Sequence, residues 1–188
     1  MTGVGLILAG GQSKRYGKQK LFENYHNQPL VFQSIQAFKQ AHMPYFIVTN
    51  NELANDFNGD VPIIVEQTAH LGPLSALCTG LEHIEPYGYS YVHVLAGDLP
   101  YIEASFVLTM QRYAQTFPES TILLPVHNER EQPLHAIYRL GCLQAIRALL
   151  PEQTSMRALY KGQNTKRLSF PNDVRFFKNI NRTTDWRD

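Results

Sequence analysis

The stretch VGLILAGGQSKRYGKQK, residues 4–20, contains the features that decide the fold. Its apolar start, residues 4–8, ends at Gly10-Gly11, which is typical of a buried parallel strand followed by a turn. Four cations follow within seven residues: Lys14, Arg15, Lys18 and Lys20. Glycines at the end of a strand let backbone N–H groups approach an anion, and cations after the turn suit a polyphosphate. The stretch therefore predicts a strand that leads into a phosphate-binding loop, with a solvated basic loop as the alternative that needs no ligand.

The remainder of the chain alternates short apolar segments with helical patterns. We expect strands at residues 45–49, 61–65, 91–95 and 121–126, and a strand that can run antiparallel at 134–138. Helical spacing of apolar residues predicts helices at 29–41, 72–81, 103–115, 140–150 and 155–160. Alternating strands and helices indicate a parallel sheet that is covered on both faces. We therefore predict an α/β fold: a single domain over residues 1–188, built as a three-layer sandwich with a mostly parallel sheet.

The composition excludes several classes of function. The chain has 188 residues, 44% of them hydrophobic, and its net charge of +1 argues against a broad electrostatic footprint for nucleic acid. Cys78 and Cys142 form no metal-ligand spacing, so we expect reduced, buried thiols. No apolar stretch is long enough to span a bilayer, and the amino terminus runs straight into the first strand. We therefore expect a cytoplasmic protein without nucleic-acid or membrane partners.

The glycine turn and the basic loop resemble the signature loop of a known family of enzymes. Leu8-Ala9-Gly10-Gly11, Arg15 and Lys20 are similar to the loop residues of nucleotidyltransferases, most of all to those of the molybdenum cofactor guanylyltransferases. The resemblance implies a Rossmann-like nucleotidyltransferase fold in which this turn wraps a guanine nucleotide. It also implies that Arg15 and Lys20 face the phosphates. The chain departs from the family at Gln19, where relatives often carry Asp.

A carboxylate follows the strand expected at 91–95, in the segment Ala96-Gly97-Asp98-Leu99-Pro100. Ligands of open α/β sheets bind beyond the carboxyl ends of the strands, so we expect Asp98 and the glycine turn at one edge. A carboxylate that faces a triphosphate suits Mg²⁺, which takes one or two carboxylates plus phosphate oxygens. The segment also resembles the family's Asp-x-Pro motif, which implies that Asp98 binds the metal. The competing interpretation is that Asp98 only starts a turn before Pro100.

Three further segments resemble the family and imply contacts with the nucleotide or the acceptor. They are Gly72-Pro73-Leu74-Ser75-Ala76, residues 131–138 and residues 177–183. Besides the glycine turn, Lys20 and Asp98, the implied nucleotide contacts are Asn50, after the second strand, and Gln67, where relatives often carry Asp. The implied acceptor contacts are Gly72, Pro73, Gln132, His135, Asn179 and Asn181. Plainer structural interpretations exist for most of them: a helix start for Gly72-Pro73, a strand edge with exposed amides for Asn179 and Asn181, and a structural role for His135.

The resemblance implies a single reaction. GTP would donate GMP to molybdopterin, whose terminal phosphate attacks the α-phosphorus, and the products would be molybdopterin guanine dinucleotide and pyrophosphate. A phosphate oxygen is an adequate nucleophile, so Arg15, Lys20 and Asp98 would act with Mg²⁺ by alignment and charge neutralisation. Proteins that deliver molybdopterin or receive the product would be partners.

Other functions remain open at this point. A cytidylyltransferase for the same cofactor typically has Ala-Ala-Gly in place of Ala9-Gly10-Gly11, and a sugar-phosphate nucleotidyltransferase needs room for a longer insertion. A nucleotide-binding regulatory module would keep the fold without turnover, and the set of Arg15, Lys20 and Asp98 argues against it. A dinucleotide-binding oxidoreductase is disfavoured because no GxGxxG follows the first strand.

Overall fold

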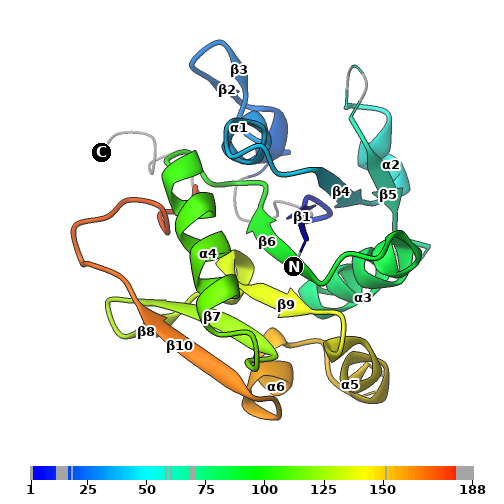
Figure 1. Ribbon diagram of the computed structural model, residues 1–188. Coiled ribbons are helices and arrows are strands. Elements are labelled where there is room, and N and C mark those ends of the chain that lie inside the picture. Colours follow the sequence, from blue (N-terminus) through cyan, green and yellow to red (C-terminus); the bar gives the residue numbers. More distant parts are fainter. Residues whose placement is uncertain are drawn as a thin grey trace.

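The sheet of the protein has the first strand near its centre. A computed structural model describes residues 2–11, 17, 19–57, 59, 61–67, 71–150 and 152–180. In these residues eight strands form one sheet in the order β10-β7-β9-β6-β1-β4-β5, with β8 added to β7 (Figure 1). Their bounds are β1 Gly3–Leu8, β4 Tyr45–Thr49, β5 Ile63–Val65, β6 Tyr91–Ala96, β7 Ile122–His127, β8 Arg130–Glu131, β9 Ile137–Arg139 and β10 Thr165–Ser169.

The half of the sheet that contains β1 is parallel. β1 pairs in parallel with both β4 and β6, and β5 pairs in parallel with β4. Beyond β6 the sheet is mixed, since β9 runs antiparallel between β6 and β7, and β10 is parallel to β7. The predicted mostly parallel sheet is confirmed, and so is the antiparallel strand near residue 138. The carboxyl ends of β1, β4, β5 and β6 consequently lie at the same edge.

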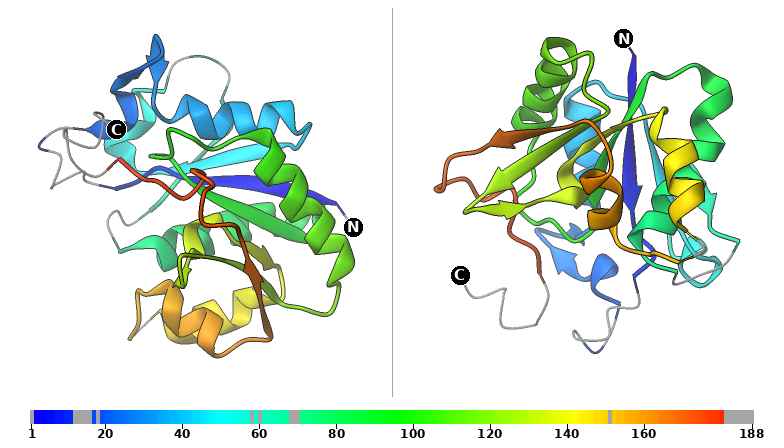
Figure 2. Two further views of the ribbon diagram at one scale, coloured as in Figure 1. Left: turned by 90° about the vertical axis from the view of Figure 1, so that its left-hand side faces the viewer. Right: turned by 90° about the horizontal axis from the view of Figure 1, so that it is seen from below.

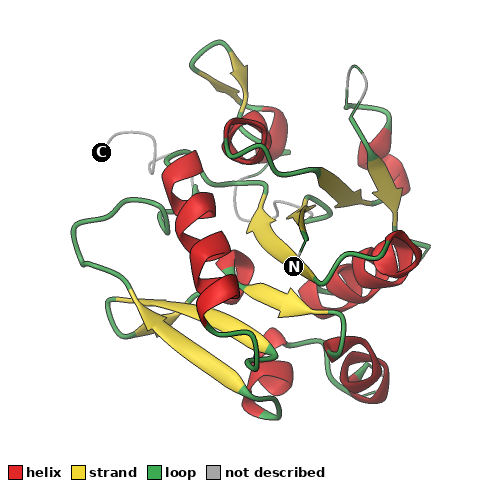
Figure 3. Ribbon diagram, in the orientation of Figure 1, coloured by secondary structure: helices red, strands yellow, loops and turns green. Residues whose placement is uncertain are grey.

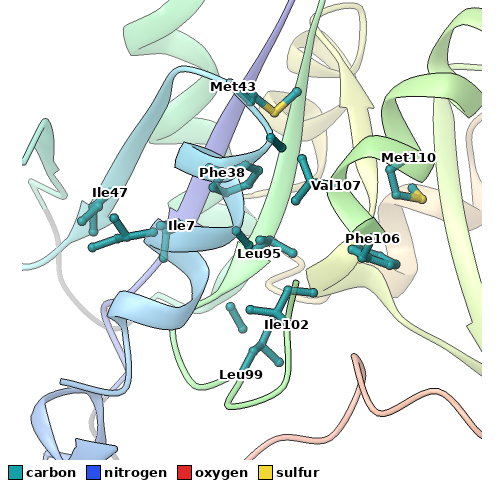
Figure 4. Close-up of a cluster of buried hydrophobic side chains, with 14 of the residues drawn as sticks. Ile7, Phe38, Met43, Ile47, Leu95, Leu99, Ile102, Phe106, Val107 and Met110 are labelled. Atoms are coloured by element: carbon teal, nitrogen blue, oxygen red, sulfur yellow. The ribbon is translucent and has the colours of Figure 1, made fainter. Parts of the chain in front are cut away.

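Helices cover both faces of this sheet. α1 (Phe32–Gln40) and α4 (Ala104–Thr116) lie on one face, and α3 (Pro73–Ile84), α5 (Cys142–Leu149) and α6 (Met156–Lys161) on the other (Figure 2, Figure 3). Each face has its own core: Ile7 of β1 belongs to a cluster with Phe38 and Phe106 (Figure 4), and Leu6 to a cluster with Leu77. Successive strand residues face opposite ways, so β1 contributes to both cores. The predicted three-layer α/β architecture is confirmed.

The first helix begins later than the sequence predicts. We expected Pro29 in its first turn, but Pro29 lies in a hairpin formed by β2 (Asn24–Tyr25) and β3 (Gln28–Pro29). The two turn residues, His26 and Asn27, have φ angles of 52° and 63°, and the Asn27 N–H donates to Asn24 Oδ1 at 2.9 Å. Such two-residue turns match the twist of paired strands, so residues 24–29 form a hairpin and α1 starts only at Phe32.

The other predicted elements are present, some with shifted ends. The strand at 45–49 has the predicted bounds, whereas β5 covers only the last three residues of the predicted 61–65. Residues 133–135 form a 3-10 turn, η3, so the strand expected at 134–138 is shorter and begins at Ile137. The short helix α2 (Asn51–Ala54) and the strand β10 were not predicted. β10 is an edge strand in which only Leu168 is buried, so it lacks an alternating hydrophobic pattern.

Both cysteines are buried and unpaired, as predicted. Burial raises the pKa of the Cys142 thiol to about 12 and that of the Cys78 thiol to about 11, so both stay protonated at neutral pH. Among the described residues, no helix is both long and apolar enough to cross a bilayer.

Gly5→Ala tests how closely α1 packs on β1. A Cβ at Gly5 would lie 2.8 Å from three carbon atoms of the Phe38 ring, which is fully buried. We expect the free energy of unfolding, measured by urea denaturation, to fall by about 1–3 kcal/mol, the usual effect of overpacking. Gly141→Ala is the matched control, because no described atom lies within 4 Å of a Cβ there. If Gly5→Ala lowered the free energy of unfolding no more than Gly141→Ala does, the result would contradict this close packing of α1 on β1.

Candidate active site

Four loops leave the sheet at the carboxyl ends of β1, β4, β5 and β6. Because these strands are parallel neighbours, the loops start side by side. They carry Gly10-Gly11 after β1, Asn50 after β4, Glu66-Gln67 after β5 and Asp98 after β6. The structure thus places the glycine turn, Asn50 and Asp98 at one edge of the sheet.

Side chains at the carboxyl end of β4 fix the direction of the glycine turn. Thr49 Oγ1 donates to the Ala9 carbonyl at 3.0 Å, and Asn50 Nδ2 donates to the Gly10 carbonyl at 3.1 Å. In a planar trans peptide the N–H points away from the carbonyl of the same unit, so the N–H groups of Gly10 and Gly11 face away from β4. Successive backbone N–H groups directed outward from a turn form a concavity that suits an anion.

Gln19 uses both ends of its amide to hold the turn. Its Nε2 donates to the Gly11 carbonyl at 3.1 Å, and its Oε1 accepts from the Leu21 N–H at 3.3 Å. Leu21 lies in the 3-10 turn η1 (Lys20–Phe22). An Asp at this position could accept a hydrogen bond but could not donate one. Gln19, which stands where relatives often carry Asp, therefore links the glycine turn to the segment that contains Lys20.

A buried carboxylate faces the glycine turn from the end of β5. Glu66 is only 5% exposed, and a Cβ added to Gly10 would meet its Oε2 at 2.8 Å. Gln67, the predicted nucleotide contact, is exposed. Burial alternates from Ile64 through Val65 to Glu66, because successive residues of an extended chain face opposite ways. Glu66 was not predicted, although that alternation was the available signal.

Lys20 contacts both Asp98 and Ile180, which lie far from it in the sequence. Its Nζ lies 2.5 Å from Asp98 Oδ2 and 2.8 Å from the carbonyl oxygen of Ile180. The Lys20 and Asp98 side chains are 15% and 14% exposed, so solvent and salt screen this pair less than a surface pair. The Ile180 N–H donates to the Asp98 carbonyl at 3.2 Å. The Lys20 ammonium therefore lies against the carboxylate of Asp98, the residue for which the sequence predicts metal binding. The contact of Lys20 with the Ile180 carbonyl was not predicted.

The predicted acceptor contacts lie on separate elements. Gly72 has a φ of 92° and precedes Pro73, which occupies the first turn of α3. Their geometry is that of a helix start, and no described contact joins them to Asp98. Gln132 is half-buried after β8, where its Nε2 donates to the Arg130 carbonyl at 3.4 Å.

His135 supports the carboxyl-terminal segment from inside the core. It is 2% exposed, and its Nε2 donates to the Phe176 carbonyl at 3.3 Å. Burial lowers the pKa of His135 to about 4, so the ring is neutral at pH 7. This burial favours the structural interpretation of His135 over contact with an acceptor. Asn179 is half-buried beside Ile180, whereas Arg15 and Asn181 lie outside the described residues.

A hollow of about 460 Å³ opens next to the loop that carries Asp98. Its walls come from residues 100–103, from the β2–β3 hairpin with Gln33, and from residues 174–176. The Arg175 guanidinium lies 3.6 Å from the centre of the Tyr101 ring, and Lys178 Nζ lies 5.7 Å from it. The ring of Tyr101, three residues after Asp98, is thus covered by two cationic side chains.

Comparisons with known proteins identify the family and the fold of the chain. Residues 5–168 match the family described as the MobA-like NTP transferase domain. A Halalkalibacterium halodurans protein named "Probable molybdenum cofactor guanylyltransferase" is 29% identical over 154 residues, which are 80% of this chain and 76% of that protein. A Thermococcus sibiricus protein of the same name is 31% identical over 149 residues, 77% of this chain and 72% of that protein. The crystal structure of molybdopterin-guanine dinucleotide biosynthesis protein A from Archaeoglobus fulgidus shares the fold, with a TM-score of 0.77 at 19% identity, covering 97% of this chain and 94% of that one.

Proposed function

The chain belongs to the family of MobA-like NTP transferase domains, and from this premise we propose that it transfers GMP from GTP to molybdopterin. The products are molybdopterin guanine dinucleotide and pyrophosphate. The names of the two relatives support this pair of substrates. Proteins that deliver molybdopterin or receive the dinucleotide are the partners that such a reaction needs.

The observation that carries the proposal is the ion pair of Lys20 and Asp98 beside the glycine turn. The ammonium of Lys20 and the outward N–H groups of Gly10 and Gly11 suit a triphosphate. The Asp98 carboxylate is the hard oxygen ligand that Mg²⁺ takes together with phosphate oxygens, and its contact with an ammonium fits a cation at this position. Mg²⁺ bound to Asp98 would neutralise charge on the phosphates. Arg15 of the basic loop completes the proposed set.

The reaction needs no nucleophile from the protein. An oxygen of the acceptor's terminal phosphate attacks the α-phosphorus of GTP, the bond to the bridging oxygen of the β-phosphate breaks, and pyrophosphate leaves with the electron pair. Lys20 and the N–H groups of the turn stabilise the charge that develops on the leaving group. Both cysteine thiols are buried and protonated, in keeping with a mechanism of alignment and charge neutralisation.

Glu66 is the residue that we assign to guanine. Guanine presents its N1–H and its amino group side by side, and one carboxylate can accept from both. The buried Glu66 carboxylate faces Gly10, which places an acceptor for both of these donors beside the glycine turn. Cytosine offers an amino group next to an acceptor nitrogen, which a carboxylate would repel. The same geometry therefore favours GTP over CTP.

Pyrophosphate release, measured with each of the four NTPs with and without molybdopterin, tests the proposed function. We expect release when GTP and molybdopterin are both present, with kcat/KM for GTP about tenfold or more above that for CTP, the effect of one unpaired buried polar group. Comparable rates with CTP would indicate a cytidylyltransferase. Release driven by a sugar phosphate would indicate a sugar-phosphate nucleotidyltransferase. Binding of GTP without release under any condition would indicate a regulatory module.

Glu66→Gln tests the assignment of the base contact. We expect kcat/KM for GTP to fall about tenfold or more, because the carboxylate is lost and the new amide N–H₂ opposes the donors of guanine. ITP lacks the amino group, so the wild-type preference for GTP over ITP should shrink in the variant. Gln67→Ala is the matched control and should change neither value. If kcat/KM for GTP fell in Gln67→Ala and not in Glu66→Gln, Gln67 and not Glu66 would be the residue that contacts the base.

A further inference from the structure

The ammonium of Lys20 lies where two oxygens of the protein converge. Its Nζ is 2.5 Å from Asp98 Oδ2 and 2.8 Å from the Ile180 carbonyl oxygen. Carboxylate and backbone carbonyl oxygens are hard ligands of the kind that Mg²⁺ and Mn²⁺ take in proteins. The ammonium therefore marks a position that suits a cation, formed by the Asp98 carboxylate and the Ile180 carbonyl.

Contacts that do not involve Lys20 hold the backbones of Asp98 and Ile180 together. The Ile180 N–H donates to the Asp98 carbonyl at 3.2 Å, and the fully buried Ile180 side chain packs with Leu30. The loop that carries Asp98 is fixed in turn, because the Gly97 N–H donates to the Leu8 carbonyl at 3.1 Å. The backbones of Asp98 and Ile180 would consequently stay together if Lys20 moved away.

We propose that Asp98 and the Ile180 carbonyl form the protein's side of the divalent-metal site, and that Lys20 occupies this site until a nucleotide binds. The proposal rests on the nucleotidyl transfer proposed above, and it adds Ile180 as a ligand and Lys20 as a competitor of the metal. The triphosphate draws Lys20 away, since phosphate oxygens are strong partners for an ammonium. The metal that accompanies the nucleotide then takes the two oxygens that Lys20 leaves.

Charge repulsion is the reason for this exchange. An ammonium and a divalent cation cannot both contact one part-buried carboxylate oxygen without strong repulsion. A triphosphate removes the conflict, because its negative charge can pair with both cations. Binding of metal and of nucleotide is therefore coupled, and each raises the affinity for the other. A permanent structural ion pair between Lys20 and Asp98 would also keep the metal off Asp98, but GTP would then not raise the affinity of this carboxylate for the metal.

Mn²⁺ binding to the nucleotide-free protein, followed by the electron paramagnetic resonance signal of free Mn²⁺, tests the competition. Lys20→Met removes the charge and keeps an unbranched side chain, and we expect it to tighten Mn²⁺ binding about tenfold or more, a typical size of coupling between sites. Lys39→Met, on the exposed side of α1, is the matched control and should leave Mn²⁺ binding unchanged. Adding Asp98→Asn to Lys20→Met should abolish the gain. Unchanged or weaker Mn²⁺ binding by folded Lys20→Met would overturn the proposal.

The unmodified protein provides a second test that needs no variant. Isoleucine labelled with carbon-13 at its carbonyl carbon is incorporated, and electron–nuclear double resonance is recorded on the complex with Mn²⁺ and GTP. A bond from the Ile180 carbonyl to the metal should give a strong carbon-13 coupling, and its absence would overturn the assignment of Ile180. Neither readout involves an acceptor or turnover, so a failure of guanylyl transfer and a failure of this metal site give different results.

Discussion

Parallel pairing of β1 with β4 on one side and with β6 on the other determines where the candidate site residues of this protein lie. The register sets Leu8 beside Val48 and Ala96, so the three strands end together. Hydrogen bonds continue past the strand ends, from the Ala9 N–H to the Val48 carbonyl and from the Gly97 N–H to the Leu8 carbonyl. The glycine turn and the Asp98 loop are therefore held by the most buried strands of the sheet, whose two faces are covered by helices.

The carboxyl-terminal segment supplies the second constraint on the same edge. Phe176 and Phe177 pack around Phe106, with ring centroids 5.5 Å from it in each case, and His135 donates to the Phe176 carbonyl. This aromatic packing positions the segment so that the Ile180 carbonyl accepts a hydrogen bond from Lys20, a residue 160 positions away in the sequence. The edge with Asp98 therefore receives residues from an early and a late segment of the chain, and the buried, neutral His135 holds the late segment through its hydrogen bond.

The sequence predicted the parts of the site that depend on one segment alone. An apolar run before Gly10-Gly11 and a carboxylate after a strand are visible among neighbouring residues, and the edge rule for α/β sheets brought Asp98 to the glycine turn. Ile180 acts through a backbone carbonyl, a group that every residue has, so no residue type signals it. The hairpin at Pro29 was missed because it depends on positive φ angles at His26 and Asn27, not on a glycine. The roles of all the site residues stay predictions, and Arg15 and Asn181 lie outside the described residues.

A crystal structure of the protein with GTP and Mn²⁺, in which anomalous scattering locates the metal, tests most directly whether this edge is the nucleotide site. We predict the triphosphate against the N–H groups of Gly10 and Gly11, the anomalous peak on Asp98, and Lys20 on the phosphates. A triphosphate bound away from the glycine turn, or Mn²⁺ bound elsewhere while Lys20 stays on Asp98, would contradict it.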